Sequence, residues 1–132
     1  MKKLLPVLFL ITVYSSCRKP QDTPPLQNII TDGVWRISLY KHNNINYTFR
    51  YTAWQFRFKA DKTVEVSNGT QTFAGTWKED VRADNFEIKI TSNEQDLSAI
   101  SQLWFNKLLT FRQVLFQNDK NNPTKELQFT KL

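Results

Sequence analysis

The chain has 132 residues, 40% of them hydrophobic and 14% aromatic, and a formal net charge of +6 at pH 7. Its single cysteine and single histidine exclude an internal disulfide, and they exclude a zinc or nucleophile–base site built from several such side chains. The positive charge is mild, and a solvated surface with surplus lysine accounts for it more simply than a site for an anionic partner.

The first 16 residues have the pattern of a secretory signal. Residues 2–3 are lysines, residues 4–13 are mostly apolar, and residues 15–16 are serines that precede Cys17. The apolar stretch is shorter than the roughly 20 residues that a membrane-spanning helix needs. We therefore expect residues 1–16 to be an export signal that is removed.

Residues 14–17, Tyr-Ser-Ser-Cys, resemble the lipobox of bacterial lipoproteins. The resemblance implies cleavage before Cys17, diacylation of its thiol and, usually, acylation of its new amino group. Two or three acyl chains anchor a protein durably, whereas one chain holds it only marginally. An ordinary signal peptide with a chance cysteine is the alternative, and the position of Cys17 directly after the two serines argues against it.

Residues 17–27 are predicted to form the lipidated cysteine and a flexible tether. Pro20, Pro24 and Pro25 are separated by polar residues, a composition that favours an extended chain. Residues 28–132 then form one domain, and about a hundred residues can bury a core without disulfides.

Alternation of apolar and polar residues, with frequent turn residues, predicts an all-β fold for this domain. Asn68-Gly69 is the strongest hairpin signal, and a helical spacing of apolar residues appears only in residues 93–105. The expected strands are residues 35–40, 54–59, 63–67, 72–78, 86–91, 107–117 and 125–131.

The first of these strands illustrates the expected two-sided pattern. Trp35, Ile37 and Leu39 form its apolar face, and the polar face includes Ser38 and Tyr40. Such strands are typical of antiparallel sheets with one face in water.

The order of several short segments resembles that of the small lipocalin-like lipoproteins of Bacteroidota. These segments are Gly33-Val34-Trp35, Phe56-Arg57-Phe58, Gly75-Thr76-Trp77 and the closing residues 127–131. The resemblance implies an antiparallel meander barrel of about eight strands, lipocalin-like, with one short helix before the last two strands. It also implies that Trp35 plugs the closed end of the barrel.

A barrel of this size is either filled by its own side chains or holds one small ligand. The candidate ligand contacts are the inward aromatic residues, which are equally suited to packing the core. Trp54 is the first choice, because it follows a polar loop and is expected near a mouth. The full set is Trp54, Phe56, Phe58, Phe73 and Trp77.

Outward Arg36, Arg57 and Lys59 are a second candidate, a basic ribbon with Tyr40 nearby that suits an anionic glycan. Export argues against nucleic acid as the partner. We expect no enzyme, because His42 lies alone in a turn and the carboxylates have turn, outer-face or helix-start positions. No cofactor and no metal site are expected.

Two functions remain open. In the first, a monomeric envelope lipoprotein is anchored through Cys17 and carries a small apolar or amphiphilic ligand in its barrel. In the second, a filled barrel contacts another envelope protein or an anionic glycan through its outer surface. Surface-exported lipoproteins of Bacteroidota tend to carry acidic residues just after the cysteine. The resemblance therefore implies that this chain, with Arg18 and Lys19 there, has an outer-membrane anchor that faces the periplasm.

Overall fold

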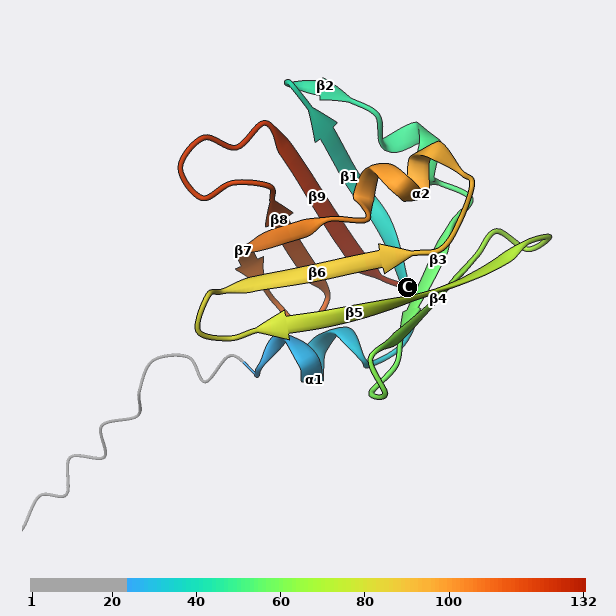
Figure 1. Cartoon of the computed structure of the whole chain (residues 1–132), viewed down its shortest axis with the longest axis horizontal. Coiled ribbons are helices and arrows are strands. Elements are labelled where there is room, and N and C mark those ends of the chain that lie inside the picture. The colour runs from blue at the N-terminus through green and yellow to red at the C-terminus, as the bar shows by residue number, and fades with distance from the viewer. Residues whose placement is uncertain (1–23) are drawn as a thin grey trace, which may run out of the picture.

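The strands of this protein close into a ring. A computed structural model describes residues 24–132 (Figure 1), and the nine strands of this part are all paired antiparallel in the order β2-β1-β3-β4-β5-β6-β7-β8-β9, with β9 also paired to β1. The strands are β1 Trp35–His42, β2 Ile45–Asn46, β3 Gln55–Phe58, β4 Thr63–Ser67, β5 Thr72–Asp80, β6 Asn85–Ile90, β7 Leu103–Leu109, β8 Gln113–Gln117 and β9 Lys125–Lys131. Since β2 pairs with β1 alone, the other strands form the barrel wall, and the predicted all-β meander barrel is confirmed.

The predicted strand at residues 107–117 is wrong, because a turn divides it between β7 and β8. The hydroxyl of Thr110 accepts a hydrogen bond from the backbone N–H of Gln113 at 2.9 Å, while the N–H of Thr110 donates to the carbonyl of Gln113 at 2.8 Å. Threonine side chains often close turns in this way. The short helix α2, Gln95–Ile100, therefore precedes the last three strands rather than the last two.

Helix α2 is also shorter than residues 93–105. It ends at Ile100, and Trp104 lies on β7 instead, where its indole N–H donates to the carbonyl of Ile100 at 2.9 Å. The spacing of Leu97, Ile100 and Trp104 is helical, but all three are buried in one core because the chain turns between the last two.

A second helix, α1 (Leu26–Ile30), was not expected from the sequence, which placed its first residues in the tether. Its residues Leu26, Ile29 and Ile30 are buried in the barrel core. The indole N–H of Trp35 donates to the carbonyl of Ile30 at 2.9 Å, which ties α1 to the start of β1. We call this the lower end of the barrel, as in Figure 1, and the end that carries α2 the upper end.

The predicted faces of β1 hold only for its first half. The pairing of β1 with β9 shifts register between Ile37 and Leu39, as in a β-bulge. One extra residue reverses the alternation beyond it. Tyr40 is therefore buried, at 5% exposure, whereas Leu39, expected inside, is half-buried.

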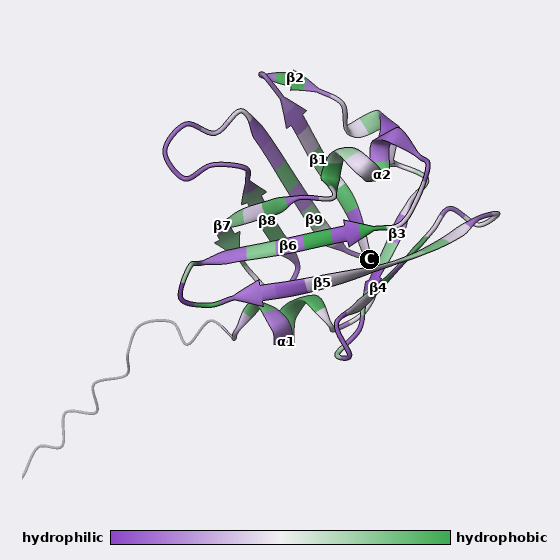
Figure 2. Cartoon of the chain, viewed as in Figure 1, coloured by the Kyte–Doolittle hydropathy of each residue, from purple (hydrophilic) through white to green (hydrophobic). Residues whose placement is uncertain are grey.

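Apolar side chains from every part of the wall meet in a single core. Along β3, β4, β6 and β9 the buried residues alternate with half-buried or exposed ones, and apolar residues alternate with polar ones in step, as the bands of β6 show in Figure 2. The largest fully buried side chains are Trp35, Trp77, Trp104, Tyr51, Phe56, Phe58, Phe86, Phe116 and Phe129.

Gly75 allows β5 and β6 to approach closely where it pairs with Ile90. A Cβ atom at this position would overlap the carbonyl oxygen of Lys89 and would lie 2.9 Å from the Cα atom of Ile90. Any side chain here would push the two strands apart, so glycine is required by the closure of the barrel.

Phe58→Ala is expected to lower the free energy of unfolding by about 3–5 kcal/mol, because it leaves a cavity at the centre of the aromatic core. Urea denaturation followed by tryptophan fluorescence measures this change. Phe49→Ala, which removes an equal ring that is 69% exposed, is the matched control and should change stability by about 0.5 kcal/mol or less. Equal losses in the two variants would contradict the proposed core.

Candidate functional site

Three of the predicted ligand contacts lie in the middle of the core. Phe56, Phe58 and Trp77 are each 2% exposed or less. The ring of Phe58 on β3 lies 5.7 Å from that of Phe86 on β6 and 5.5 Å from that of Phe129 on β9. These strands are not neighbours in the sheet, so the rings make contact across the interior of the barrel. Side chains, rather than an open calyx, occupy this central volume.

The two remaining candidates form a pair at the upper end. Trp54 and Phe73 have ring centroids 5.9 Å apart. Trp54 is 6% exposed, and its backbone N–H donates to the carbonyl of Tyr51 in the short 3-10 helix η1, Thr48–Tyr51. Trp35, the predicted plug, lies at the lower end, fully buried beside α1.

The upper end is closed by a tyrosine pair beneath α2. The rings of Tyr40 and Tyr51 meet edge to face at 5.1 Å, and the hydroxyl of Tyr51 donates to the carbonyl of Asp96 at 2.7 Å. Burial is the main cause that raises the pKa of both phenols, so both remain neutral at physiological pH. A neutral Tyr51 keeps its donor proton and holds the start of α2 over the barrel.

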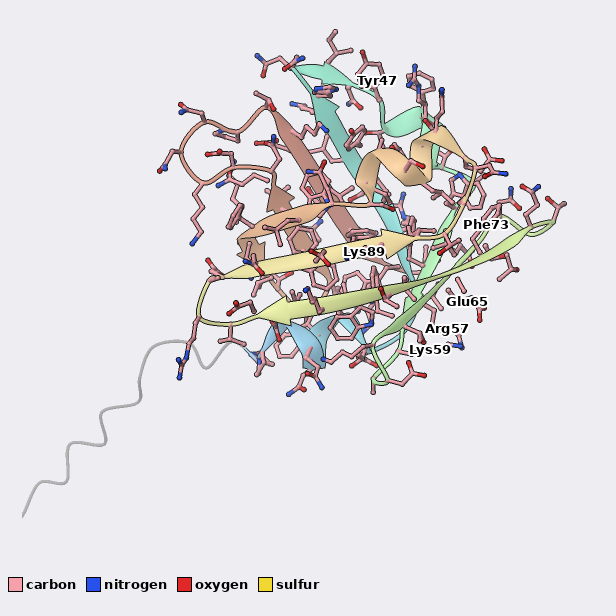
Figure 3. All side chains as sticks on the ribbon, in the orientation of Figure 1. Tyr47, Arg57, Lys59, Glu65, Phe73 and Lys89 are labelled. Carbon is pink, nitrogen blue, oxygen red and sulfur yellow. The ribbon has the colours of Figure 1, made fainter. Side chains whose placement is uncertain are left out.

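Outside the core, the segment between β1 and β3 exposes two large apolar side chains. Ile45 on β2 and Phe49 on η1 are 55% and 69% exposed. The guanidinium of Arg50 lies 4.7 Å from the ring centre of Tyr47 and 5.8 Å from that of Phe49. We define the upper patch as Ile45, Tyr47, Phe49 and Arg50; Figure 3 marks Tyr47 at this end.

Local hydrogen bonds hold the upper patch in place. The carboxamide oxygen of Asn46 accepts from both the N–H and the hydroxyl of Thr48, at 2.9 and 2.5 Å. The Thr48 oxygen accepts from the N–H of Tyr40 at 2.9 Å, and the N–H of Tyr47 donates to the Tyr40 carbonyl at 2.8 Å. The turn before β2 is sharp because Asn43 and Asn44 both have positive φ. The segment is therefore docked on β1 by bonds from Asn46, Tyr47 and Thr48.

The upper patch combines aromatic and aliphatic side chains with one arginine. Tryptophan, tyrosine and arginine side chains contribute much of the binding energy at protein interfaces, and pre-ordered groups lose little entropy on binding. Arg50 lies 3.9 Å from a carboxylate oxygen of Asp96, and this exposed pair leaves the cation accessible. Residues 43–46 were predicted as the polar loop before Trp54, and the patch was not predicted. The aromatic residues that follow this loop were the available signal.

The predicted basic ribbon is divided by acidic side chains. Lys59 forms an ion pair with Glu65 at 3.3 Å, and Arg57 lies opposite Glu65 in the β3–β4 register. Figure 3 shows these three side chains together on the outer face. Arg36 lies outward on β1, whereas Tyr40, expected beside it, is buried. The outer face therefore has mixed charge rather than one continuous basic strip.

Surface depressions occur on the same outer face. Two of them run along β5 and β6 and are open to solvent; one lies around Val81 and Leu103, and the other around Thr76 and Lys89. Their linings are mainly the outward side chains of the wall. Within residues 24–132, no three His, Cys, Asp or Glu side chains are grouped to hold a metal ion.

The fold is that of a small antiparallel meander barrel with a filled interior. No protein-family model matches the chain, and no curated protein matches its sequence. A solved structure is similar to it: a DUF4847 family protein from Bacteroides vulgatus, with a TM-score of 0.60 and 16% sequence identity over 81% of this chain and 97% of that protein. At this identity the likeness concerns the fold, and it connects the barrel to a protein of a Bacteroides species.

Cys17, the predicted lipidation site, lies outside the described residues. Among residues 24–132, no helix is both long and apolar enough to cross a membrane. The roles of Cys17 and of the aromatic set, and the absence of enzymatic activity, therefore stay predictions from the sequence.

Tyr51→Phe is expected to lower the free energy of unfolding by about 1–3 kcal/mol, because the Asp96 carbonyl loses its buried donor. Hydrogen exchange should quicken in α2 more than in the barrel wall. Tyr47→Phe is the matched control, since the Tyr47 hydroxyl has no hydrogen-bond partner within residues 24–132. A loss in the control as large as in Tyr51→Phe would refute a role for the Tyr51 bond.

Proposed function

We propose that this chain is a non-enzymatic lipoprotein of the cell envelope, anchored through Cys17, whose filled barrel displays a protein-binding surface. The observation that carries this proposal is the combination of a core packed ring against ring with a rigid, exposed aromatic and arginine patch. A barrel whose central rings touch across its axis has little room for a guest. We therefore expect the barrel to bind its partner through its outer surface.

A protein partner fits the upper patch better than an anionic glycan does. The patch contains one cation and three large apolar or aromatic side chains, and its cation already has the carboxylate of Asp96 nearby. The basic side chains on the outer wall are interleaved with Glu65 and Glu87, which reduces their attraction for a polyanion. An apolar centre with an arginine is typical of protein interfaces.

The second candidate is the ligand carrier predicted from the aromatic residues. The Trp54–Phe73 pair supports it, because these two rings lie at the end of the core rather than in its centre. Native mass spectrometry of protein purified from its own envelope separates the two functions. We expect the mass of the lipidated chain alone; a bound amphiphile that Trp54→Ala releases would favour the carrier.

The anchor is tested by Cys17→Ala and by globomycin, which blocks cleavage of lipoprotein signals. Both treatments should leave unprocessed or released protein, because acyl chains on Cys17 provide the hold on the membrane. Gel mobility and membrane fractionation measure the outcome. Cys17→Ser, which keeps the size of the side chain, is the matched control and should behave like Cys17→Ala. Unchanged processing and unchanged membrane fractionation would exclude the anchor.

Protease accessibility on intact cells tests the proposed periplasmic side of the outer membrane.

The upper patch is tested with a photoreactive phenylalanine analogue at position 49 in cells that express the protein. We expect one protein adduct of discrete mass at this position, and we expect Arg50→Glu to reduce its yield at least about tenfold, as the loss of a single interface hot spot would. The same analogue at position 111, an equally exposed phenylalanine on the β7–β8 turn, is the matched control. Equal adducts at both positions, or adducts with polysaccharide instead of protein, would overturn the assignment.

A further inference from the structure

Every second connection between consecutive strands lies at the lower end of the barrel. The turns β3–β4, β5–β6 and β7–β8 all lie at the end where β1 begins, because each strand reverses the direction of the one before it. Helix α1 lies at the same end (Figure 1), and the side chain of Lys62 in the β3–β4 turn donates to that of Gln27 in α1 at 2.8 Å. The chain therefore enters the domain at the lower end.

Two of these turns expose an apolar residue followed directly by an arginine. Val81 on the β5–β6 turn is 73% exposed and precedes Arg82; Phe111 on the β7–β8 turn is 68% exposed and precedes Arg112. Both arginines are exposed, and neither forms an ion pair with another residue of the range 24–132. The tips of these two hairpin turns therefore share one feature, an exposed apolar side chain followed by an exposed arginine.

The backbone of each turn fixes its tip in the exposed position. A carboxylate oxygen of Asp80 accepts from the N–H groups of Arg82 and Ala83, both at 3.1 Å. In the β7–β8 turn, the hydroxyl of Thr110 accepts from the N–H groups of Arg112 and Gln113 at 3.4 and 2.9 Å. Val81 and Phe111 are thus held away from the core by bonds that do not involve their own side chains.

Chain length restricts what can lie opposite the lower end. Nine peptide units separate Cys17 from Leu26, and a fully extended chain covers at most about 3.6 Å for each, or roughly 30 Å. If Cys17 carries the acyl chains of the proposed function, the membrane surface lies within this distance of α1. An apolar tip with an adjacent guanidinium suits such a surface, since the apolar side chain enters the headgroup layer and the cation stays beside the phosphates.

We propose that the lower end docks on the lipid surface of the anchoring membrane through Val81-Arg82 and Phe111-Arg112. This inference rests on the proposed lipidation of Cys17 and adds a second, orienting contact to it. The two small apolar tips, each beside a cation and each on its own turn, fit a lipid layer better than the apolar core of a protein interface. Docking in this orientation points the upper patch away from the membrane.

The experiment uses the mature, lipidated chain, purified from its own membrane and reconstituted into vesicles of phosphatidylethanolamine and phosphatidylglycerol. Because Cys17 is the single natural cysteine and is acylated, Ala83→Cys at the lower end and Asn121→Cys in the upper β8–β9 loop each add one free thiol for a nitroxide label. Power saturation of the electron paramagnetic resonance signal compares collisions with oxygen, which enters lipid, and with a nickel chelate, which remains in water.

The label at position 83 should show a several-fold higher ratio of oxygen to nickel collisions than the label at position 121. Val81→Ser with Phe111→Ser should bring the ratio at position 83 down to that at position 121, while the protein stays on the vesicles. Ile45→Ser with Phe49→Ser, which removes two exposed apolar residues from the upper patch, is the matched control and should leave the ratio unchanged.

Equal ratios at positions 83 and 121 in otherwise native, vesicle-bound protein would overturn the docking inference and leave the anchor intact. Failure of the anchor gives a different result, because the chain would then not sediment with its own membrane or with the vesicles. A fall in the ratio of oxygen to nickel collisions at position 83 in the Ile45→Ser and Phe49→Ser control would also overturn the inference. The lipid contact would then depend on the upper patch and not on the lower end.

Discussion

The contact of phenylalanine rings across the barrel interior is the constraint on which the rest of this structure depends. Phe86 stacks on Phe116 at 5.1 Å with an interplanar angle of 1°, and Phe129 meets Phe56 edge to face at the same distance. Offset stacking and edge-to-face contact are the favoured geometries for aromatic pairs, and each adds about 0.5–1.5 kcal/mol to the burial of the rings. Residues 24–132 contain no cysteine, so these contacts stabilise the barrel without the covalent links that disulfide-rich small domains use.

A filled interior also determines how the two ends are built. The core continues beyond the strands into α1 at one end and into Tyr51, Leu97 and Ile100 at the other. Both ends are thus parts of the core and not movable lids. The chemistry available for recognition is left to exposed side chains on turns and on the segment between β1 and β3. The positions of these side chains are precise because the turns beneath them are hydrogen-bonded.

The sequence predicted most of the wall because the period-two pattern is a direct trace of burial on one side of each strand. Phe56, Phe58, Val64 and Val66 are all inside, as their alternation indicates. The predictions failed where a bulge or a turn interrupted the regular alternation of apolar and polar residues. A bulge reversed the second half of β1, and a threonine-capped turn interrupted the apolar run that became β7 and β8.

The binding surfaces were harder to predict than the wall. The aromatic residues predicted to face inward do so. The alternation of apolar and polar residues along a strand, however, cannot distinguish a ring that lines a pocket from a ring that fills the interior. Helix α1 is too short for a periodic signal, and its buried residues Leu26, Ile29 and Ile30 belong to a core that only the folded barrel assembles. The upper patch depends on Asn46 and Thr48 holding a loop against Tyr40, a contact between segments that no local pattern describes.

The pairing of β1 with β9 has a consequence for how the protein is made. This pair has the longest register in the sheet and joins segments from the two halves of the chain, with the hydroxyls of Ser38 and Thr130 in contact across 92 residues. The ribosome synthesises the chain from the N-terminus to the C-terminus. The edge of β1 that pairs with β9 therefore stays open until β9, the last strand, has been made. Closure of so long a loop is slow, and an open edge is a template for pairing with other chains. The wait for β9 is therefore the period in which this barrel is most exposed to aggregation and to proteases.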